Sequence, residues 1–143
     1  MRRVEARPEA TMIEDVSAHI LIVEDDPDIL SSLAEVIREE GYDVETAANG
    51  YQALAKLETG MPDLIFLDLM MPLMDGWKFM ETAKQRFPEM VSRVVLLSAV
   101  HGLSDEAVKL GVREFLTKPF DLEDVTRVTH RLCPNGTEPH CGL

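Results

Sequence analysis

Short apolar runs alternate with helical patterns along most of the chain. His19–Val23, Leu64–Leu67 and Val94–Leu97 are almost wholly apolar, which is typical of strands buried on both faces of a parallel sheet. Tyr42–Ala47 alternates between apolar and polar positions, which predicts a strand with one wetter face. Glu114–Leu116 predicts a brief fifth strand.

Apolar residues at helical spacing follow each predicted strand. Asp26 and Pro27 suit the cap and first turn of a helix that ends at Gly41. This β-α order, repeated five times, predicts an α/β fold with a doubly wound, five-stranded parallel sheet of the flavodoxin-like type. The remaining helices are expected around Ala53, Leu54 and Leu57, around Trp77, Phe79, Met80 and Ala83, over residues 104–110, and from an Asp121 cap through Val125, Val128 and Leu132.

The limits of this pattern predict one domain between two short flanking segments. The 143 residues suit a single domain with a substantial core. Residues 1–18 mix charges with a proline and show no periodicity, so a flexible or loosely docked extension is expected there. The periodic region covers residues 19–132, and residues 133–143 are interpreted as a tail because they are rich in proline, glycine and polar side chains.

The charge and hydropathy of the chain disfavour two classes of function. Fourteen basic residues against 26 acidic residues give a net charge of −12, which disfavours direct binding to nucleic acid or to anionic lipid. No apolar run approaches the roughly 18 residues needed to cross a bilayer. The basic start, Met1–Pro8, lacks the apolar stretch of a signal peptide. A cytoplasmic protein is therefore expected.

Two cysteines, Cys133 and Cys141, lie in the last eleven residues. In a reducing cytoplasm they are expected to be free thiols. An alternative hypothesis joins them to His130 and His140 as zinc ligands, but the spacing of the four residues matches no familiar zinc-finger or ribbon pattern.

Chemically active side chains stand where four of the predicted strands end. Glu24 and Asp25 follow the first strand, Asp68 the third, Ser98 the fourth and Lys118 the fifth. In a parallel α/β sheet the carboxyl ends of the strands form one edge, and ligands bind outside that edge. We therefore expect these five side chains to converge.

The three acids in this set would repel one another without a cation. An oxygen-rich site suits Mg²⁺, which keeps several waters and favours phosphate partners. Aspartate is a competent nucleophile toward phosphorus, and phosphoryl transfer needs positioning and charge neutralisation more than proton chemistry. Lys118, a metal ion and the Ser98 hydroxyl are suited to that neutralisation around Asp68.

Four spaced motifs resemble the signatures of response-regulator receiver domains, the family of the chemotaxis protein CheY. They are VEDD at Val23–Asp26, IFLDLMMPLMDG at Ile65–Gly76, LLSA at Leu96–Ala99 and LTKPF at Leu116–Phe120. The motifs stand in the family's order, and the resemblance covers about residues 19–132. It implies a CheY-like fold and a phosphoprotein of two-component signal transduction.

By this resemblance Asp68 is the phosphoacceptor. Asp25 and Asp68 would bind Mg²⁺ (or Mn²⁺) directly, and Glu24 would hold the ion through water. The backbone carbonyl of Met70 would complete the protein's share of the coordination.

The resemblance also assigns residues that bind the phosphoryl group and transmit its presence. Ser98 and Lys118 would bind the phosphoryl oxygens, and Pro119 would follow Lys118 through a cis peptide bond. On phosphorylation the Ser98 hydroxyl would move toward the phosphoryl group and the ring of Phe115 would turn inward. That movement would change the face made by the last helix, strand and helix. Gly76 is interpreted as structural.

These assignments imply a single-domain response regulator that is not a classical enzyme, although it assists its own phosphorylation and slow dephosphorylation. The implied donor is a sensor histidine kinase or a phosphotransfer protein, and the implied output is a downstream protein target. A monomer or weak homodimer is expected. Met70 and Val100, two residues past Asp68 and Ser98, are apolar and cannot orient an attacking water, which predicts a long-lived phosphoryl group.

Three alternatives belong to other classes. A phosphorylation-independent docking module remains open, because the segment between Ser98 and Lys118 is shorter than usual in the family and predicts a short or shifted fourth helix. A hydrolase of the haloacid dehalogenase type would need a second acid where Met70 stands. A flavodoxin-like flavin carrier would need a phosphate-binding loop after the first strand, where Glu24 and Asp25 stand instead.

Overall fold

The computed structural model describes residues 17–134, which contain five strands, five α-helices and one 3₁₀ helix in alternating order. The predicted extension, apart from its last two residues, and most of the predicted tail lie outside the described residues. The elements are β2 (His19–Val23), α1 (Pro27–Glu39), β3 (Asp43–Ala47), α2 (Gly50–Thr59), β4 (Leu64–Asp68), α3 (Gly76–Arg86), η1 (Pro88–Arg93), β5 (Val94–Ser98), α4 (Leu103–Leu110), β6 (Glu114–Thr117) and α5 (Leu122–Leu132).

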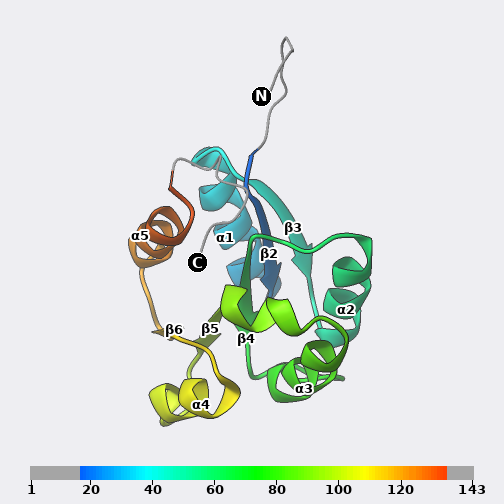
Figure 1. Ribbon diagram of the computed structural model, residues 1–143. Helices are drawn as coiled ribbons and strands as arrows, with labels where there is room; N and C mark the ends of the chain where they lie inside the picture. Colours follow the sequence, from blue (N-terminus) through cyan, green and yellow to red (C-terminus); the bar gives the residue numbers. More distant parts are fainter. Residues whose placement is uncertain (1–16, 135–143) are drawn as a thin grey trace.

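The five strands form one parallel sheet in the order β3-β2-β4-β5-β6, with helices on both sides (Figure 1). This arrangement confirms the predicted doubly wound α/β fold. The chain first adds β3 on one side of β2 and then returns to add β4, β5 and β6 on the other side. Such a reversal of direction leaves a crevice at the carboxyl ends of the two central strands, β2 and β4.

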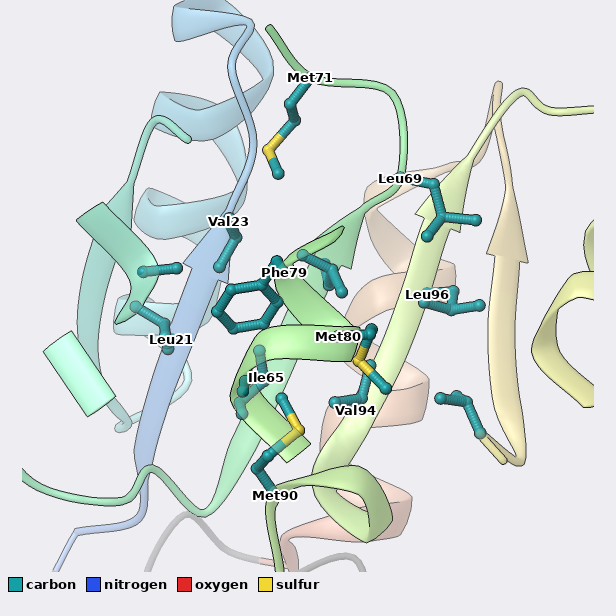
Figure 2. Packing of buried hydrophobic residues seen from close by; sticks show 14 of the residues in the cluster. Leu21, Val23, Ile65, Leu69, Met71, Phe79, Met80, Met90, Val94 and Leu96 are labelled. Atoms are coloured by element: carbon teal, nitrogen blue, oxygen red, sulfur yellow. The ribbon is translucent and has the colours of Figure 1, made fainter. Parts of the chain in front are cut away.

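The two faces of the sheet carry separate apolar cores, because successive side chains of a strand point to opposite faces. Leu21 and Val23 pack with residues of α2, α3 and α4. Figure 2 shows the ring of Phe79, from α3, beside Leu21, Val23 and Ile65 in this core. Ile20 and Ile22 face the other way and pack with residues of α1 and α5.

Local sequence signals account for where the helices begin and end. The Asp26 side chain accepts hydrogen bonds from the backbone N–H groups of Asp28 and Ile29, as a helix cap does. Helix α4 has only 8 residues and lies between Gly102 and Gly111, whose φ angles of 74° and 78° are left-handed. The predicted short fourth helix is therefore confirmed. No helix within residues 17–134 is long and apolar enough to cross a membrane.

Cys133 corrects one prediction. It is buried at the end of α5 and is disulfide-bonded. The prediction of free thiols is thus wrong for this residue. The zinc hypothesis loses a ligand, because a disulfide sulfur is not a thiolate. His130, another residue of that hypothesis, contacts the Tyr42 hydroxyl and the Glu40 carboxylate.

Candidate functional site

The sequence-predicted side chains do meet at one edge of the sheet. Glu24 and Asp25 follow β2, Asp68 ends β4, Ser98 ends β5 and Lys118 follows β6. These four strands are neighbours and run in the same direction, so their carboxyl ends lie together.

A cluster of three carboxylates forms the centre of the site. Glu24, Asp25 and Asp68 each offer an oxygen, and these oxygens lie within 4.8 Å of one another. Glu24 and Asp68 are 1% and 2% exposed. The Lys118 ammonium donates to Oε1 of Glu24 at 2.7 Å and to Oδ2 of Asp68 at 3.2 Å. One partly buried cation thus offsets part of the repulsion between two buried acids.

Burial and charge pull the pKa values of this group in opposite directions. Burial raises the pKa of the Glu24 carboxyl, and the hydrogen bond from Lys118 offsets that effect only in part. Burial by itself would lower the pKa of Lys118. The hydrogen bond to Glu24 and the charge of Asp68 outweigh burial and raise that pKa. Lys118 therefore carries a firmly held positive charge beside Asp68.

Backbone groups fix the orientation of the two buried acids. Oδ1 of Asp68 accepts a hydrogen bond from the backbone N–H of Met70 at 3.1 Å. Oε2 of Glu24 accepts one from the backbone N–H of Asp26 at 3.1 Å. In each carboxylate, one oxygen thus accepts a hydrogen bond from the backbone and the other accepts one from Lys118. The Met70 side chain itself is 57% exposed.

Ser98 and Phe115, the predicted switch pair, lie on neighbouring strands. Ser98 is fully buried, and its hydroxyl oxygen accepts from the Val100 backbone N–H at 3.4 Å. Phe115 is aligned with Leu96, two residues before Ser98, and its side chain is 38% exposed. Aligned residues of adjacent strands share a face of the sheet. Phe115 and Ser98 therefore lie on the face that α4 covers.

Gly76 and Pro119 shape the loops around the acids. The peptide bond between Lys118 and Pro119 is cis, as predicted. The Gly76 backbone N–H donates to the Leu69 carbonyl at 2.9 Å. A Cβ at Gly76 would lie 2.6 Å from Cα of Leu69 and 2.7 Å from the carbonyl oxygen of Asp68. Only glycine allows the start of α3 to approach the phosphoacceptor candidate this closely.

The donor set fits a hard divalent cation. The clustered ligand atoms of Glu24, Asp25 and Asp68 are all oxygens, which Mg²⁺ and Mn²⁺ prefer over nitrogen or sulfur. Asp25 is the one member of the cluster that is not buried, so one side of the cluster is open to solvent. The sequence predicted that these three acids would converge, which the structure confirms, but it did not predict the contact between Lys118 and Glu24. The only indication of this contact in the sequence was that Glu24 and Lys118 both follow predicted strands.

Comparisons with known proteins show the family to which this chain belongs. A family model described as the response regulator receiver domain matches residues 20–130. The transcriptional regulatory protein TcrA of Mycobacterium tuberculosis is 35% identical over 122 residues, which cover 84% of this chain and 47% of TcrA. The chain therefore spans about half the length of that relative.

Solved structures give the same picture. The chemotaxis response regulator CheY4 of Vibrio cholerae is similar with a TM-score of 0.73 and 29% identity, covering 80% of this chain and 98% of CheY4. The response regulator TrrA of Thermotoga maritima, solved in complex with Mg²⁺-BeF, is similar with a TM-score of 0.68 and 29% identity. That match covers 78% of this chain and 96% of TrrA.

Proposed function

Since this chain belongs to the family of response regulator receiver domains, we propose that it accepts a phosphoryl group on Asp68 with Mg²⁺ (or Mn²⁺) bound. The donor is a phosphohistidine of a sensor histidine kinase or a phosphotransfer protein. One observation carries the proposal: a buried Asp68 lies between the Lys118 ammonium, at 3.2 Å, and two further carboxylates suited to a metal.

The chemistry is a transfer between two nucleophiles. A carboxylate oxygen of Asp68 forms a bond to phosphorus while the bond between phosphorus and the donor's imidazole nitrogen breaks, and the leaving imidazole takes a proton from water. Lys118 neutralises charge on the phosphoryl oxygens, and the Met70 N–H keeps the carboxylate oriented. A divalent cation held by Glu24, Asp25 and Asp68 supplies further neutralisation of those oxygens.

A surface beside the site suits the donor protein. A cavity of about 540 Å³ lies between α1 and the segment that joins β6 to α5, and Lys118 lines it. Ile29 and Leu33 of α1 and Phe120 of the connection give it an apolar lining. We propose that the donor docks here, because an apolar contact next to Lys118 brings its phosphohistidine to Asp68.

Phosphorylation is proposed to act through Ser98 and Phe115. The Ser98 hydroxyl moves toward the phosphoryl group and gives up its contact with Val100. The half-exposed Phe115 ring then turns inward on the same face of the sheet. The changed surface of α4, β6 and α5 binds a downstream protein. The domain thus has two conformations, and phosphorylation shifts the population toward the one with the inward Phe115 ring.

The proposal places this receiver, over residues 19–132, between an extension at residues 1–18 and a tail at residues 133–143. It acts as a regulator in the cytoplasm, as a monomer or weak homodimer, and without contacting nucleic acid or membrane. The net charge of −12 supports the absence of such contacts, because an acidic chain repels both nucleic acid and anionic membrane lipid.

Intact-mass measurement after incubation with acetyl phosphate and Mg²⁺ tests the proposal. We expect one added phosphoryl group on the wild-type chain, and none on Asp68→Asn or after treatment with a chelator. Asp105→Asn is the matched control, because Asp105 is an exposed acid on α4 outside the cluster, and it should be modified as the wild type is.

A failure of the wild type to gain mass, with Mg²⁺ binding demonstrated separately, would refute the proposal. The phosphorylation-independent docking module would then be the better explanation, since it needs the fold but not the chemistry. Modification of Asp68→Asn at the wild-type rate would show that another residue is the acceptor.

A further inference from the structure

A second polar pocket lies at the opposite edge of the sheet from Asp68. Its volume is about 270 Å³. Leu64, Val94 and Glu114, the first residues of β4, β5 and β6, line it, together with the end of α5. The phosphoacceptor site stands at the last residues of the same strands, so the two sites are separated by the length of the sheet.

Three arginines give this pocket a charge opposite to that of the whole chain. Arg93 comes from η1, Arg113 from the turn before β6 and Arg131 from α5. Glu114 is the one acid in the lining, so the lining has a formal charge of +2 within a chain of net charge −12. The concentration of positive charge in one concave place attracts anions.

Arg131 is already satisfied by Glu114. Its two terminal nitrogens donate to the two carboxylate oxygens of Glu114 at 3.0 and 2.7 Å. Hydrogen bonds from Arg131 lower the pKa of Glu114 despite its partial burial, so the pair stays charged. This fork ties α5 to β6 and occupies both carboxylate oxygens of Glu114. The charge of Arg113 also acts on Glu114, but neither Arg113 nor Arg93 donates a hydrogen bond to it.

Arg93 and Arg113 have unused donors. Nη1 of Arg93 donates to the Pro62 carbonyl at 3.0 Å. Nε of Arg93 is buried without an acceptor anywhere in residues 17–134. Arg113 makes no hydrogen bond or ion pair with the described part of the chain. A buried donor without an acceptor is costly and points to a bound water or ion.

We propose that this pocket is a binding site for a small phosphate-bearing ligand, held by Arg93 and Arg113 with Arg131 at its rim. Guanidinium groups match the geometry of phosphate oxygens better than any other side chain. The volume of about 270 Å³ lies just below the usual range for drug-sized ligands, so inorganic phosphate or a small phosphate monoester fits. The site needs neither Asp68 nor a metal and is independent of the proposed phosphorylation.

Calorimetric titration of the full chain with inorganic phosphate, and separately with glycerol 3-phosphate, tests the proposal. Both titrations contain a chelator, so that phosphate is not held at the acidic cluster through a metal, and chloride at equal ionic strength is the blank. We expect saturable binding of one ligand per chain. The comparison of the two probes shows whether the free ion or an ester binds more tightly.

Two variants distinguish a specific binding site from a general attraction of anions to positive charge. Arg113→Gln should weaken binding about tenfold or more, because a charge-assisted hydrogen bond is lost. Arg127→Gln is the matched control: it removes the same charge from α5 at a residue that does not line the pocket, and it should change affinity less than about twofold. Arg113 is exposed, so its replacement is expected to leave the fold intact.

Two results would overturn the proposal. One is the absence of saturable binding by either probe, and the other is an equal loss of affinity in Arg113→Gln and Arg127→Gln. Amide chemical-shift mapping gives an independent check. Shifts confined to residues 92–94, 111–114 and 131–132 support the pocket, whereas shifts around Glu24 and Asp68 place the ligand at the acidic cluster instead and refute it.

Discussion

At the scale of single residues, the candidate site is held by contacts that leave Asp68 little freedom. One of its oxygens accepts from the Met70 backbone and the other from Lys118. The close approach of Gly76 to the Asp68 carbonyl fixes the backbone behind the carboxylate. Such fixed groups lower the reorganisation needed for the proposed transfer of a phosphoryl group to Asp68.

Gly76→Ala should disturb this arrangement. The added Cβ would lie 2.6 Å from Cα of Leu69, and backbone cannot move aside as a flexible side chain does. We expect the free energy of unfolding to fall by about 2 kcal/mol and phosphorylation by acetyl phosphate to slow. Urea denaturation and intact mass measure the two effects. Gly60→Ala is the control, since a Cβ there meets nothing within 4 Å, and a similar loss in both variants would contradict this explanation.

Met70 should govern how long the phosphoryl group remains. Its side chain is 57% exposed and follows Asp68 by two residues, yet it has no polar atom with which to orient water. Met70→Asn should shorten the half-life of phosphorylated protein several-fold, because an amide can position an attacking water. The decay of the phosphorylated mass after desalting measures this lifetime. Leu73→Asn makes the same kind of change at an 80% exposed position of this loop and should have little effect. Unchanged decay in Met70→Asn would refute the idea.

At the scale of elements, a side-chain contact joins two helices on the same face of the sheet. Nε1 of Trp77, in α3, donates to Oε1 of Glu106, in α4, at 2.8 Å. Helix α4 is short and has a left-handed glycine at each end, so this contact is one of its few fixed attachments to α3. The position of α4 should therefore depend on the charge of Glu106.

The pH dependence of this contact has a definite direction. The hydrogen bond from Trp77 holds the pKa of Glu106 below its usual range, with the charge of Lys109 as a smaller contribution in the same direction. Because the folded pKa is lower than the unfolded one, the contact contributes stability above the usual glutamate range. That contribution is lost as the pH falls through the lowered folded pKa. Trp77 is the only tryptophan, so its fluorescence reports the loss directly.

A fluorescence titration should show a transition below the usual pKa of glutamate. Glu106→Gln should remove that transition while keeping an acceptor for the indole. A transition within the ordinary glutamate range, or one that persists in Glu106→Gln, would show that the contact does not control the environment of Trp77.

The elements also show what sequence patterns can and cannot predict. Strands β2, β4 and β5 and helix α1 were predictable, because nearly continuous apolar runs and the Asp26-Pro27 cap are strong local signals. The 3₁₀ helix η1 was missed, since only Met90 of its six residues is buried and no periodicity results. The prediction for Cys133 failed because it was argued from the cell compartment rather than from position.

The acidic site and the arginine pocket also differ in how far the sequence predicts them. The acidic site was predictable because each residue follows an apolar strand, and parallel strands end together. Arg93, Arg113 and Arg131 belong to no motif and meet only because η1, the turn before β6 and the end of α5 adjoin at the other edge. The contact of Lys118 with both acids depends on the direction of a long side chain, which spacing does not specify.

At the scale of the whole molecule, the charges are divided between the two edges of one sheet. The acidic cluster lies at the carboxyl ends of the strands and the arginine pocket at their amino ends. The net charge of −12 makes the compact chain repel itself, and the buried acids add to that cost. A cation at the acidic edge should therefore stabilise the fold beyond what ionic screening does.

Urea denaturation with MgCl₂ and with NaCl at equal ionic strength should separate these two effects. Both salts are expected to raise stability by screening repulsion. Mg²⁺ should add about 1.4 kcal/mol when its free concentration is about ten times the dissociation constant, because it binds the folded chain alone. Asp25→Asn should remove most of that increment and keep the effect of NaCl, since it deletes a carboxylate of the cluster. Equal stabilisation by the two salts in the wild type would mean that the three acids hold no cation, and it would weaken the case for metal-dependent phosphorylation of Asp68.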